Sequence, residues 1–134
     1  NRIFDLYKGV NLILHAGDIG EEDVLTQLET IAKTTAVYGN TDSLKIRSKI
    51  PKEVTLIVEG LKIHLSHNEI ISKRDFDIIV QGHTHLPESF YEGKNLFINP
   101  GAANPNNSIP AGQASVVILE LKEKEIISST ILFF

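Results

Sequence analysis

Asp77-Ile78-Ile79-Val80-Gln81-Gly82-His83-Thr84-His85 is the stretch of this chain that says most about its architecture. Its first four residues include a β-branched run that is typical of a buried strand. The strand would end at Gly82 and place both histidines at its C-terminal edge, where α/β sheets usually carry ligand sites. If the backbone stayed extended, His83 and His85 would share one face and could serve one site or two adjacent sites. A surface turn containing two histidines by chance explains the stretch equally well.

Polar turns follow two earlier strand-like runs in the same manner. The run Val10 to Ala16 leads into Gly17-Asp18-Ile19-Gly20, where the glycines allow a tight turn that exposes the carboxylate of Asp18. The run Thr35 to Tyr38 is followed by Gly39-Asn40-Thr41-Asp42. Ordinary turn chemistry also accounts for Asn40, because Asn and Gly both favour turns.

A hairpin is predicted next, with strands Val54 to Val58 and Leu61 to Leu65 around the turn Glu59-Gly60. The second strand separates two histidines by position. His64 lies inside the strand, as a packed or exposed strand residue would, whereas His67 falls just beyond its end. His67 is therefore the better candidate for a functional residue.

The remaining pattern predicts an α/β domain. Helices are expected at the N-terminus up to Lys8, over Glu21 to Lys33 and over Ile70 to Arg74. The C-terminal half is predicted to be strands at Glu88 to Tyr91, Leu96 to Ile98, Ala114 to Leu121 and Ile126 to Leu132. Between them the turn Asn99-Pro100-Gly101-Ala102 offers backbone amides that could face an anion, although an ordinary Pro-Gly turn fits as well.

Composition restricts the chemistry. The chain has 134 residues, of which 42% are hydrophobic, as expected for one globular domain. It has no cysteine, so a metal would be held by nitrogen and oxygen. A net charge of −4 without a basic stripe argues against a dedicated nucleic-acid surface, but not against a phosphate ester, because bound metal ions supply positive charge locally. No membrane-spanning run or signal peptide is recognisable, and a cytoplasmic location is predicted.

Candidate ligands recur at strand ends, and this recurrence matters more than any single motif. They are Asp18, Asn40, His67, His83 and His85. In an α/β sheet wound in one sense, these positions converge at a single edge. One carboxylate, one amide oxygen and three imidazoles suit a borderline divalent ion such as manganese, iron, nickel or zinc.

These blocks, together with Asn99-Pro100-Gly101, resemble the calcineurin-like metallophosphoesterases. The small single-domain prokaryotic phosphodiesterases of that superfamily are the most similar branch, and the scaffold subunit of the retromer coat is similar as well. The resemblance covers nearly the whole chain. It implies an α/β fold built as a two-sheet β-sandwich flanked by helices, in four layers αββα.

The resemblance also implies roles for individual residues. Asp18 would bridge two metal ions, and Asn40, His67 and His83 would complete one of the two sites. His85 would belong to the other site. Asp42 would lie behind the ligands and, with Asp18, Asn40 and His67, is counted among the catalytic residues. The backbone around Gly101 would help to shape the pocket.

One departure from the family pattern is clear. The family begins with a strand that ends in Asp-x-His, and this chain contains no Asp-x-His. Of two divalent metal sites, only one therefore retains all of its protein ligands; the other keeps only Asp18 and His85. The chain starts at Asn1 and has no methionine, so residues 1–134 are interpreted as a single metallophosphoesterase domain that is N-terminally incomplete and lacks its first strand. A missing central strand would expose sheet edges to pairing partners.

The resemblance predicts a metal-dependent phosphoesterase, and specifically a phosphodiesterase, that hydrolyses a small phosphodiester through a metal-bridging hydroxide. Manganese is the first choice of metal, with nickel, iron or zinc as alternatives. Related enzymes often carry a histidine where this chain has Thr41, which favours substrates with good leaving groups. No membrane partner is expected, and homo-oligomerisation stays open. The alternative is a non-catalytic interaction scaffold on the same fold. The 134 residues alone are predicted to bind at most one metal tightly and to hydrolyse little.

Overall fold

The computed structural model describes residues 2–70, 75–104, 106–109 and 111–134. Its helices are α1 (Arg2–Leu6), α2 (Glu22–Glu29) and α3 (Leu44–Arg47). Its strands are β1 (Leu12–His15), β2 (Lys33–Ala36), β3 (Glu53–Val58), β4 (Leu61–Ser66), β5 (Ile78–Val80), β6 (Glu88–Glu92), β7 (Asn95–Asn99), β8 (Ser115–Lys122) and β9 (Glu125–Phe133). None of the helices in these ranges has the length and apolarity that a membrane span requires.

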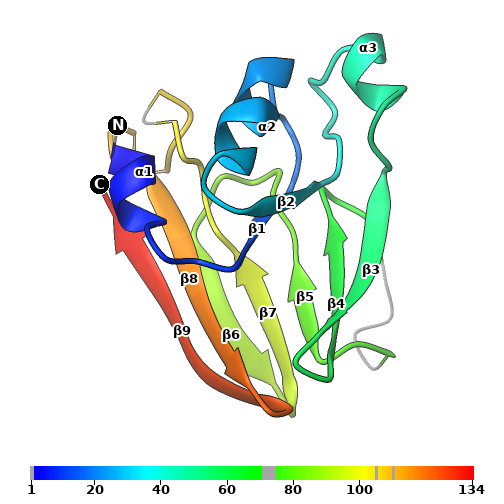
Figure 1. Cartoon of the computed structure of the whole chain (residues 1–134), viewed down its shortest axis with the longest axis vertical. Helices are drawn as coiled ribbons and strands as arrows, with labels where there is room; N and C mark the ends of the chain where they lie inside the picture. Colours follow the sequence, from blue (N-terminus) through cyan, green and yellow to red (C-terminus); the bar gives the residue numbers. More distant parts are fainter. Residues whose placement is uncertain (1, 71–74, 105, 110) are drawn as a thin grey trace.

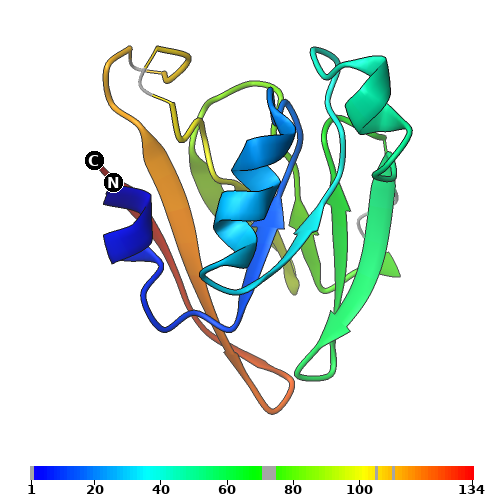
Figure 2. The same cartoon turned by 45° about the horizontal axis from the view of Figure 1, so that its top comes forward.

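The strands form two layers (Figures 1 and 2). One layer is a five-stranded sheet in the order β3-β4-β5-β7-β6. The other consists of two separate pairs, the parallel pair β1-β2 and the antiparallel pair β8-β9. Helix α2 covers the outer face of β1-β2, where Val24 and Leu25 pack against a cluster that includes Ala36. The predicted α/β sandwich is therefore confirmed.

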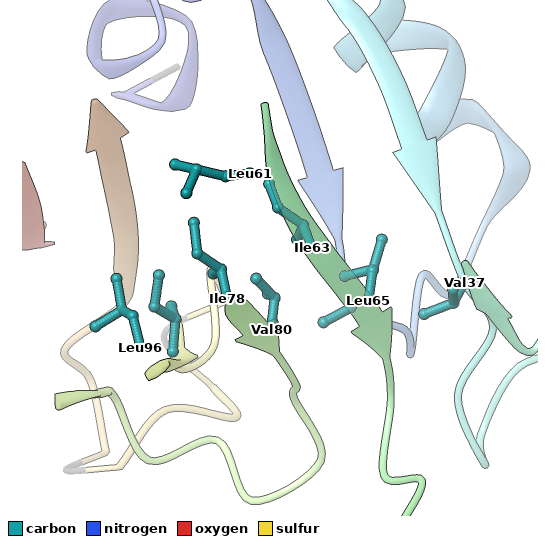
Figure 3. Packing of buried hydrophobic residues seen from close by; sticks show 9 residues of the cluster. Val37, Leu61, Ile63, Leu65, Ile78, Val80 and Leu96 are labelled. Carbon is teal, nitrogen blue, oxygen red and sulfur yellow. The ribbon is translucent and has the colours of Figure 1, made fainter. Parts of the chain in front are cut away.

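The main core lies between the two strand layers (Figure 3). Strand β5 is its centre, because all three of its residues are buried and both neighbouring strands, β4 and β7, run parallel to it. Burial on both faces explains why β5 reads as an unbroken β-branched run. The core side chains come from several strands and two strand ends: Ala16, Val37, Leu61, Ile63, Leu65, Ile78, Val80, Leu96 and Ile98.

Two predicted boundaries around α2 are wrong. The helix expected over Glu21 to Lys33 ends at Glu29, and the strand expected over Thr35 to Tyr38 occupies Lys33–Ala36. At the helix end the hydroxyl of Thr30 donates to the carbonyl oxygen of Gln27 (2.6 Å). Such a bond competes with continuation of the helix, and pairing of the following residues with β1 fixes them as a strand.

Helix α3 was missed by the sequence pattern because it is only four residues long. Ser43 caps it, accepting a hydrogen bond from the backbone amide of Ile46 (3.3 Å). The predicted hairpin around Glu59-Gly60 is confirmed as β3-β4. The strands predicted at Glu88 to Tyr91 and Leu96 to Ile98 are found as β6 and β7, which pair in an antiparallel manner. Of the helix predicted for Ile70 to Arg74, residues 71–74 lie outside the described residues.

Candidate metal centre

The polar turns that follow β1, β2, β4 and β5 meet at one edge of the sandwich. The amide of Val37, after β2, donates to the carbonyl oxygen of His15 at the end of β1 (3.1 Å). The amide of Gly82, after β5, donates to the carbonyl oxygen of His67 after β4 (3.1 Å). The predicted convergence of the strand ends is therefore found in the structure.

Two glycines let these turns approach one another. A Cβ atom on Gly17 would lie 2.5 Å from Nδ1 of His67, and Gly17 also has a φ of +102°. A Cβ atom on Gly39 would lie 2.2 Å from Oδ1 of Asp18. Both contacts are far below van der Waals distance, so only glycine fits at these positions.

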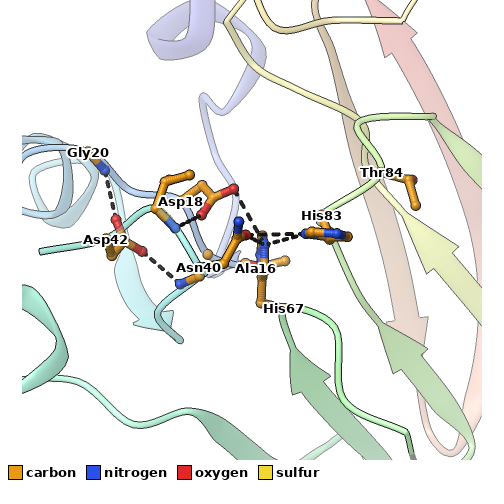
Figure 4. Close-up of polar contacts among 12 residues, drawn as sticks. Ala16, Asp18, Gly20, Asn40, Asp42, His67, His83 and Thr84 are labelled. Atoms are coloured by element: carbon orange, nitrogen blue, oxygen red, sulfur yellow. Dashed lines mark hydrogen bonds and ion pairs between the residues drawn. The ribbon is translucent and has the colours of Figure 1, made fainter.

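His67 is the centre of the resulting cluster (Figure 4). Its Nδ1 donates to the carbonyl oxygen of Ala16 (2.7 Å), a contact that is buried. Its Nε2 faces three other groups: Oδ1 of Asn40 at 2.8 Å, Nδ1 of His83 at 3.2 Å and Oδ2 of Asp18 at 3.4 Å. Nδ1 of His83 also lies 3.2 Å from Oδ1 of Asn40. Four side chains from four different turns thus direct donor atoms at a common point.

The donor set fits a divalent metal ion. Because Nδ1–H of His67 donates to the carbonyl oxygen of Ala16, the neutral ring presents a lone pair at Nε2. That lone pair faces the amide oxygen of Asn40 and a carboxylate oxygen of Asp18, and neither oxygen can donate a proton. Such a group of acceptors is stabilised by a shared cation. Two ligands bound to one ion at about 2.1 Å lie roughly 3.0 to 3.4 Å apart, close to the observed separations.

Asn40 is essential to this arrangement. Among the described residues, no three histidine, cysteine, aspartate or glutamate side chains form a metal-binding group on their own. Figure 4 shows why the amide matters, since Asn40 and His67 lie between Asp18 and His83. The candidate centre therefore consists of Asp18, Asn40, His67 and His83 together.

An extended backbone would place His83 and His85 on one face, but the backbone at these two residues is not extended. Both residues have left-handed backbones, with φ of 67° at His83 and 62° at His85. Only His83 contacts Asn40 and His67. His85 lies close enough to Asp18 to influence its carboxyl group electrostatically. His83 therefore belongs to the cluster around His67, whereas His85 lies near Asp18 without contacting Asn40 or His67.

Asn99 holds the loop that carries these two histidines. Its Nδ2 donates to the carbonyl oxygen of Gly82 and to the hydroxyl of Thr84, both at 2.9 Å. Its Oδ1 accepts from the amide of Gly101 (3.0 Å). The Gly101 amide is consequently not free to face an anion, in contrast to the expectation for this turn. Left-handed conformations at non-glycine residues are unfavourable, and the Asn99 contacts help to maintain them.

Asp42 holds two turns together. Its Oδ2 accepts from the amide of Gly39 (2.7 Å) and its Oδ1 accepts from the amide of Gly20 (3.0 Å). Its side chain is buried, with 5% exposure. Arg47 adds support by donating to the carbonyl oxygens of Asp42 and Asn40. Because both carboxylate oxygens are occupied, we assign Asp42 to positioning rather than to proton transfer.

The environment of Asp18 favours its charged form. Burial by itself raises the pKa of this carboxyl group. Hydrogen bonds from Thr41 and the nearby His67 and His85 outweigh burial and hold the pKa below its usual range. One of these bonds is the Thr41 amide, which donates to Oδ1 of Asp18 at 3.0 Å. An ionised carboxylate is the form that binds a cation.

His15 belongs to the neighbourhood of the site, and sequence reasoning missed it. Its Nδ1 accepts from the amide of Gly17 (3.2 Å), so it supports the turn that carries Asp18. Burial lowers the pKa of His15, and the nearby carboxylates of Asp42 and Asp18 partly oppose this effect. The available signal was its position at the end of β1, two residues before Gly17, which the apolar strand pattern concealed.

The lowered pKa of His15 predicts a pH dependence of stability. The unfolded chain takes up a proton on His15 near pH 6.5, whereas the folded chain resists it, so stability falls as the pH drops below 6.5. One proton contributes at most about 1.4 kcal/mol per pH unit. Urea unfolding between pH 8 and 5.5 should show a steeper loss of stability for the wild type than for His15→Gln. Equal slopes in the two proteins would contradict this assignment.

Comparison with known proteins gives a consistent picture. The family model for the calcineurin-like phosphoesterase superfamily domain matches residues 1–124. A probable metallophosphoesterase of Methanothermobacter thermautotrophicus is 32% identical over 112 residues, which are 75% of this chain and 64% of that protein. The match to a similar probable metallophosphoesterase of Methanocaldococcus jannaschii covers 57% of that protein. This chain thus spans about three fifths of the length of these two relatives.

Solved structures share the fold. Vps29 of Entamoeba histolytica, crystallised with zinc, superposes with a TM-score of 0.78 at 21% identity, covering 99% of this chain and 87% of Vps29. A structure described as a novel archaeal phosphodiesterase superposes with a TM-score of 0.75 at 24% identity, covering 98% of this chain and 88% of that protein. At these identities the similarity establishes the fold and leaves the activity to the site itself.

Proposed function

Because the chain belongs to the calcineurin-like phosphoesterase superfamily, we propose that it forms the metal-binding domain of a phosphodiesterase that acts on small phosphodiesters. The observation that supports this proposal most strongly is the group of donor atoms around Nε2 of His67. Asn40, His83 and Asp18 each place a donor within 3.4 Å of that nitrogen. A domain that served only as a scaffold has no physical need for such a group.

Each residue of the candidate centre has a definable task. His67 keeps its Nε2 lone pair directed at the centre because Ala16 fixes the Nδ1 proton. Asp18 supplies negative charge, and its depressed pKa keeps it ionised. Asn40 adds a neutral oxygen that leaves the net charge of the centre unchanged. When bound, divalent metal ions would polarise phosphoryl oxygens and lower the pKa of water to near neutrality.

The metal is proposed to be manganese, with zinc as the first alternative because the related Vps29 structure contains zinc. Nitrogen and oxygen donors are compatible with both ions. Two metal ions are proposed, with Asp18 shared between them. By the family resemblance, the site formed by Asp18, Asn40, His67 and His83 would be the one with its full set of ligands within residues 1–134. His85 would contribute to the other.

The preference for substrates with good leaving groups rests on Thr41. The turn after Asn40 offers Thr41, whose amide is committed to Asp18, and a threonine hydroxyl is a poor proton donor. A substrate whose leaving group departs without protonation is therefore favoured. Phosphodiesters of acidic alcohols or phenols have this property.

Two measurements on the chain test the proposal. Manganese titration followed by calorimetry should give one tightly bound ion per chain. With manganese present, bis-p-nitrophenyl phosphate should be hydrolysed faster than p-nitrophenyl phosphate, slowly in absolute terms but in proportion to bound metal. Monoester hydrolysis far exceeding diester hydrolysis would contradict the diester preference. Weak metal binding without hydrolysis of either ester would favour the non-catalytic scaffold. The cytoplasmic location and the oligomeric state stay predictions.

A further inference from the structure

Gln81 stands between β5 and the loop that carries His83, and its side chain reaches across to the turn that follows β4. Its Nε2 donates to the hydroxyl oxygen of Ser66 (3.0 Å) and to the carbonyl oxygen of Glu69 (2.6 Å). A side-chain amide nitrogen has two hydrogens, so both are used. The two acceptors lie one residue before and two residues after His67. The side chain of Gln81 therefore holds this turn on both sides of the central histidine of the candidate metal centre.

The backbone around Gln81 is fixed independently of its side chain. The amide of Gln81 donates to the carbonyl oxygen of Ile98 in β7 (3.0 Å). The next amide, that of Gly82, donates to the carbonyl oxygen of His67 (3.1 Å). Val80, the residue before Gln81, belongs to the core between the two strand layers. The side chain of Gln81 thus extends from a well-anchored backbone to the turn after β4.

A second contact reaches the same turn from the segment before β3. Nζ of Lys52 lies 3.2 Å from Oε1 of Glu69, but the side chain of Lys52 is largely exposed, so this ion pair is expected to be weak. Both hydrogen bonds from Gln81 are partly buried, and Ser66 is completely buried. The bonds from Gln81 are therefore the stronger restraint on the turn.

The position of this turn matters because it carries His67, whereas the loop after Gln81 carries His83. Nε2 of His67 and Nδ1 of His83 lie 3.2 Å apart (Figure 4). The ligands of a functional site have to be held within about 0.5 Å of their productive geometry. Gln81 joins the two segments that carry these histidines, in the same way that Asp42 joins the other two turns of the centre.

We propose that Gln81 is a positioning residue of the candidate metal centre, which sets the separation of His67 and His83 by joining the turn after β4 to the end of β5. The inference rests on the proposed function, because the separation matters for function only if both histidines bind one ion. Gln81 acts through Ser66 and Glu69, to which it donates both of its amide hydrogens. Glutamine is suited to this task because it is neutral and carries two donors on one nitrogen, whereas an ionised glutamate only accepts.

Gln81→Met tests the proposal, because methionine has nearly the length of glutamine and lacks both donors. Asn95→Leu is the matched control, since Nδ2 of Asn95 also donates to a backbone carbonyl oxygen, that of Phe76, but at the opposite end of β7 from the centre. Calorimetric titration should show manganese binding about tenfold weaker in Gln81→Met than in the wild type, as is typical when a group that orients a ligand is lost. The control should keep its affinity within a few-fold. If the wild type binds manganese and Gln81→Met binds it equally well, the proposal is overturned.

A second readout needs neither metal nor activity. In the metal-free chain the Nδ1 proton of His67 lies in the buried bond to Ala16, and NMR measures its exchange with water. That proton should exchange several-fold faster in Gln81→Met and at the wild-type rate in Asn95→Leu. Equal exchange in the two variants would overturn the proposal whatever the manganese titration shows. A wild type that binds no manganese would contradict the proposed function, and the exchange rates would then decide by themselves whether Gln81 holds His67 in place.

Ser66→Ala replaces Gln81→Met if circular dichroism shows that the methionine variant does not fold. This substitution removes one of the two acceptors of Gln81 and leaves Gln81 itself in the chain. Weaker manganese binding and faster exchange of the His67 proton are again expected. Wild-type values for both quantities would overturn the proposal.

Discussion

His67→Ala is expected to weaken manganese binding by about 100-fold or more. The substitution removes the nitrogen on which three other donors converge, at distances of 2.8 to 3.4 Å. Asp18 and His83 then lack the group that lies between them, and fewer than four protein donors are left. Changes to groups that merely orient a ligand typically lower metal affinity 10- to 100-fold, so loss of the central ligand should have at least the upper effect.

His64→Gln provides a matched control for this experiment. His64 lies three residues earlier in β4, is 2% exposed and packs against Phe76 (ring centroids 4.8 Å apart) rather than in the centre. The control should lose some stability and keep its manganese affinity within a few-fold. Isothermal titration calorimetry at one pH, with far-UV circular dichroism to verify folding, separates the two. Wild-type manganese affinity in His67→Ala would remove His67 from the centre and weaken the proposed function.

The position of the site could be predicted from the sequence because glycine and polar residues follow each buried strand. Asp18 and His67 are both placed by strands whose apolar patterns are clear, and a parallel arrangement brings their ends together. His67 could be chosen over His64 because the apolar pattern shows where β4 ends, and His67 lies just beyond that end. These inferences rest on the local spacing of apolar residues, which reports directly on burial when a strand lies in the core.

The details inside the site could not be predicted because they depend on backbone angles and on partners distant in the chain. His83 and His85 adopt left-handed conformations, which are uncommon for any residue other than glycine and which Asn99 helps to hold. Asp42 resembles a potential catalytic carboxylate in the sequence, yet in the structure it binds two backbone amides. His15 was concealed by an apolar strand pattern, although it supports the Asp18 turn.

Asp42→Asn is expected to destabilise the folded chain by about 3 kcal/mol, a large fraction of the stability of a small domain. The side chain of Asp42 is nearly isosteric with asparagine, so the effect is one of hydrogen bonding rather than of packing. One carboxylate oxygen that accepts from Gly39 or Gly20 becomes an amide NH₂, which leaves a backbone N–H facing another donor. The turns that carry Asp18 and Asn40 lose the bond that joins them, and manganese affinity should fall roughly 10- to 100-fold.

Asp77→Asn is the matched control, because Oδ2 of Asp77 also accepts from a backbone amide, that of Lys62, at 2.7 Å. Asp77 is exposed, so water can replace the lost bond, and the expected loss is below about 1 kcal/mol. Urea unfolding at pH 7 gives both free energies, and calorimetry gives the manganese affinities. If the two variants lost equal stability, or if Asp42→Asn left metal binding intact, Asp42 would not be the residue that holds the Asp18 and Asn40 turns together. A large loss confined to Asp42→Asn would instead establish that one buried carboxylate, without touching a metal, sets the geometry of those that do.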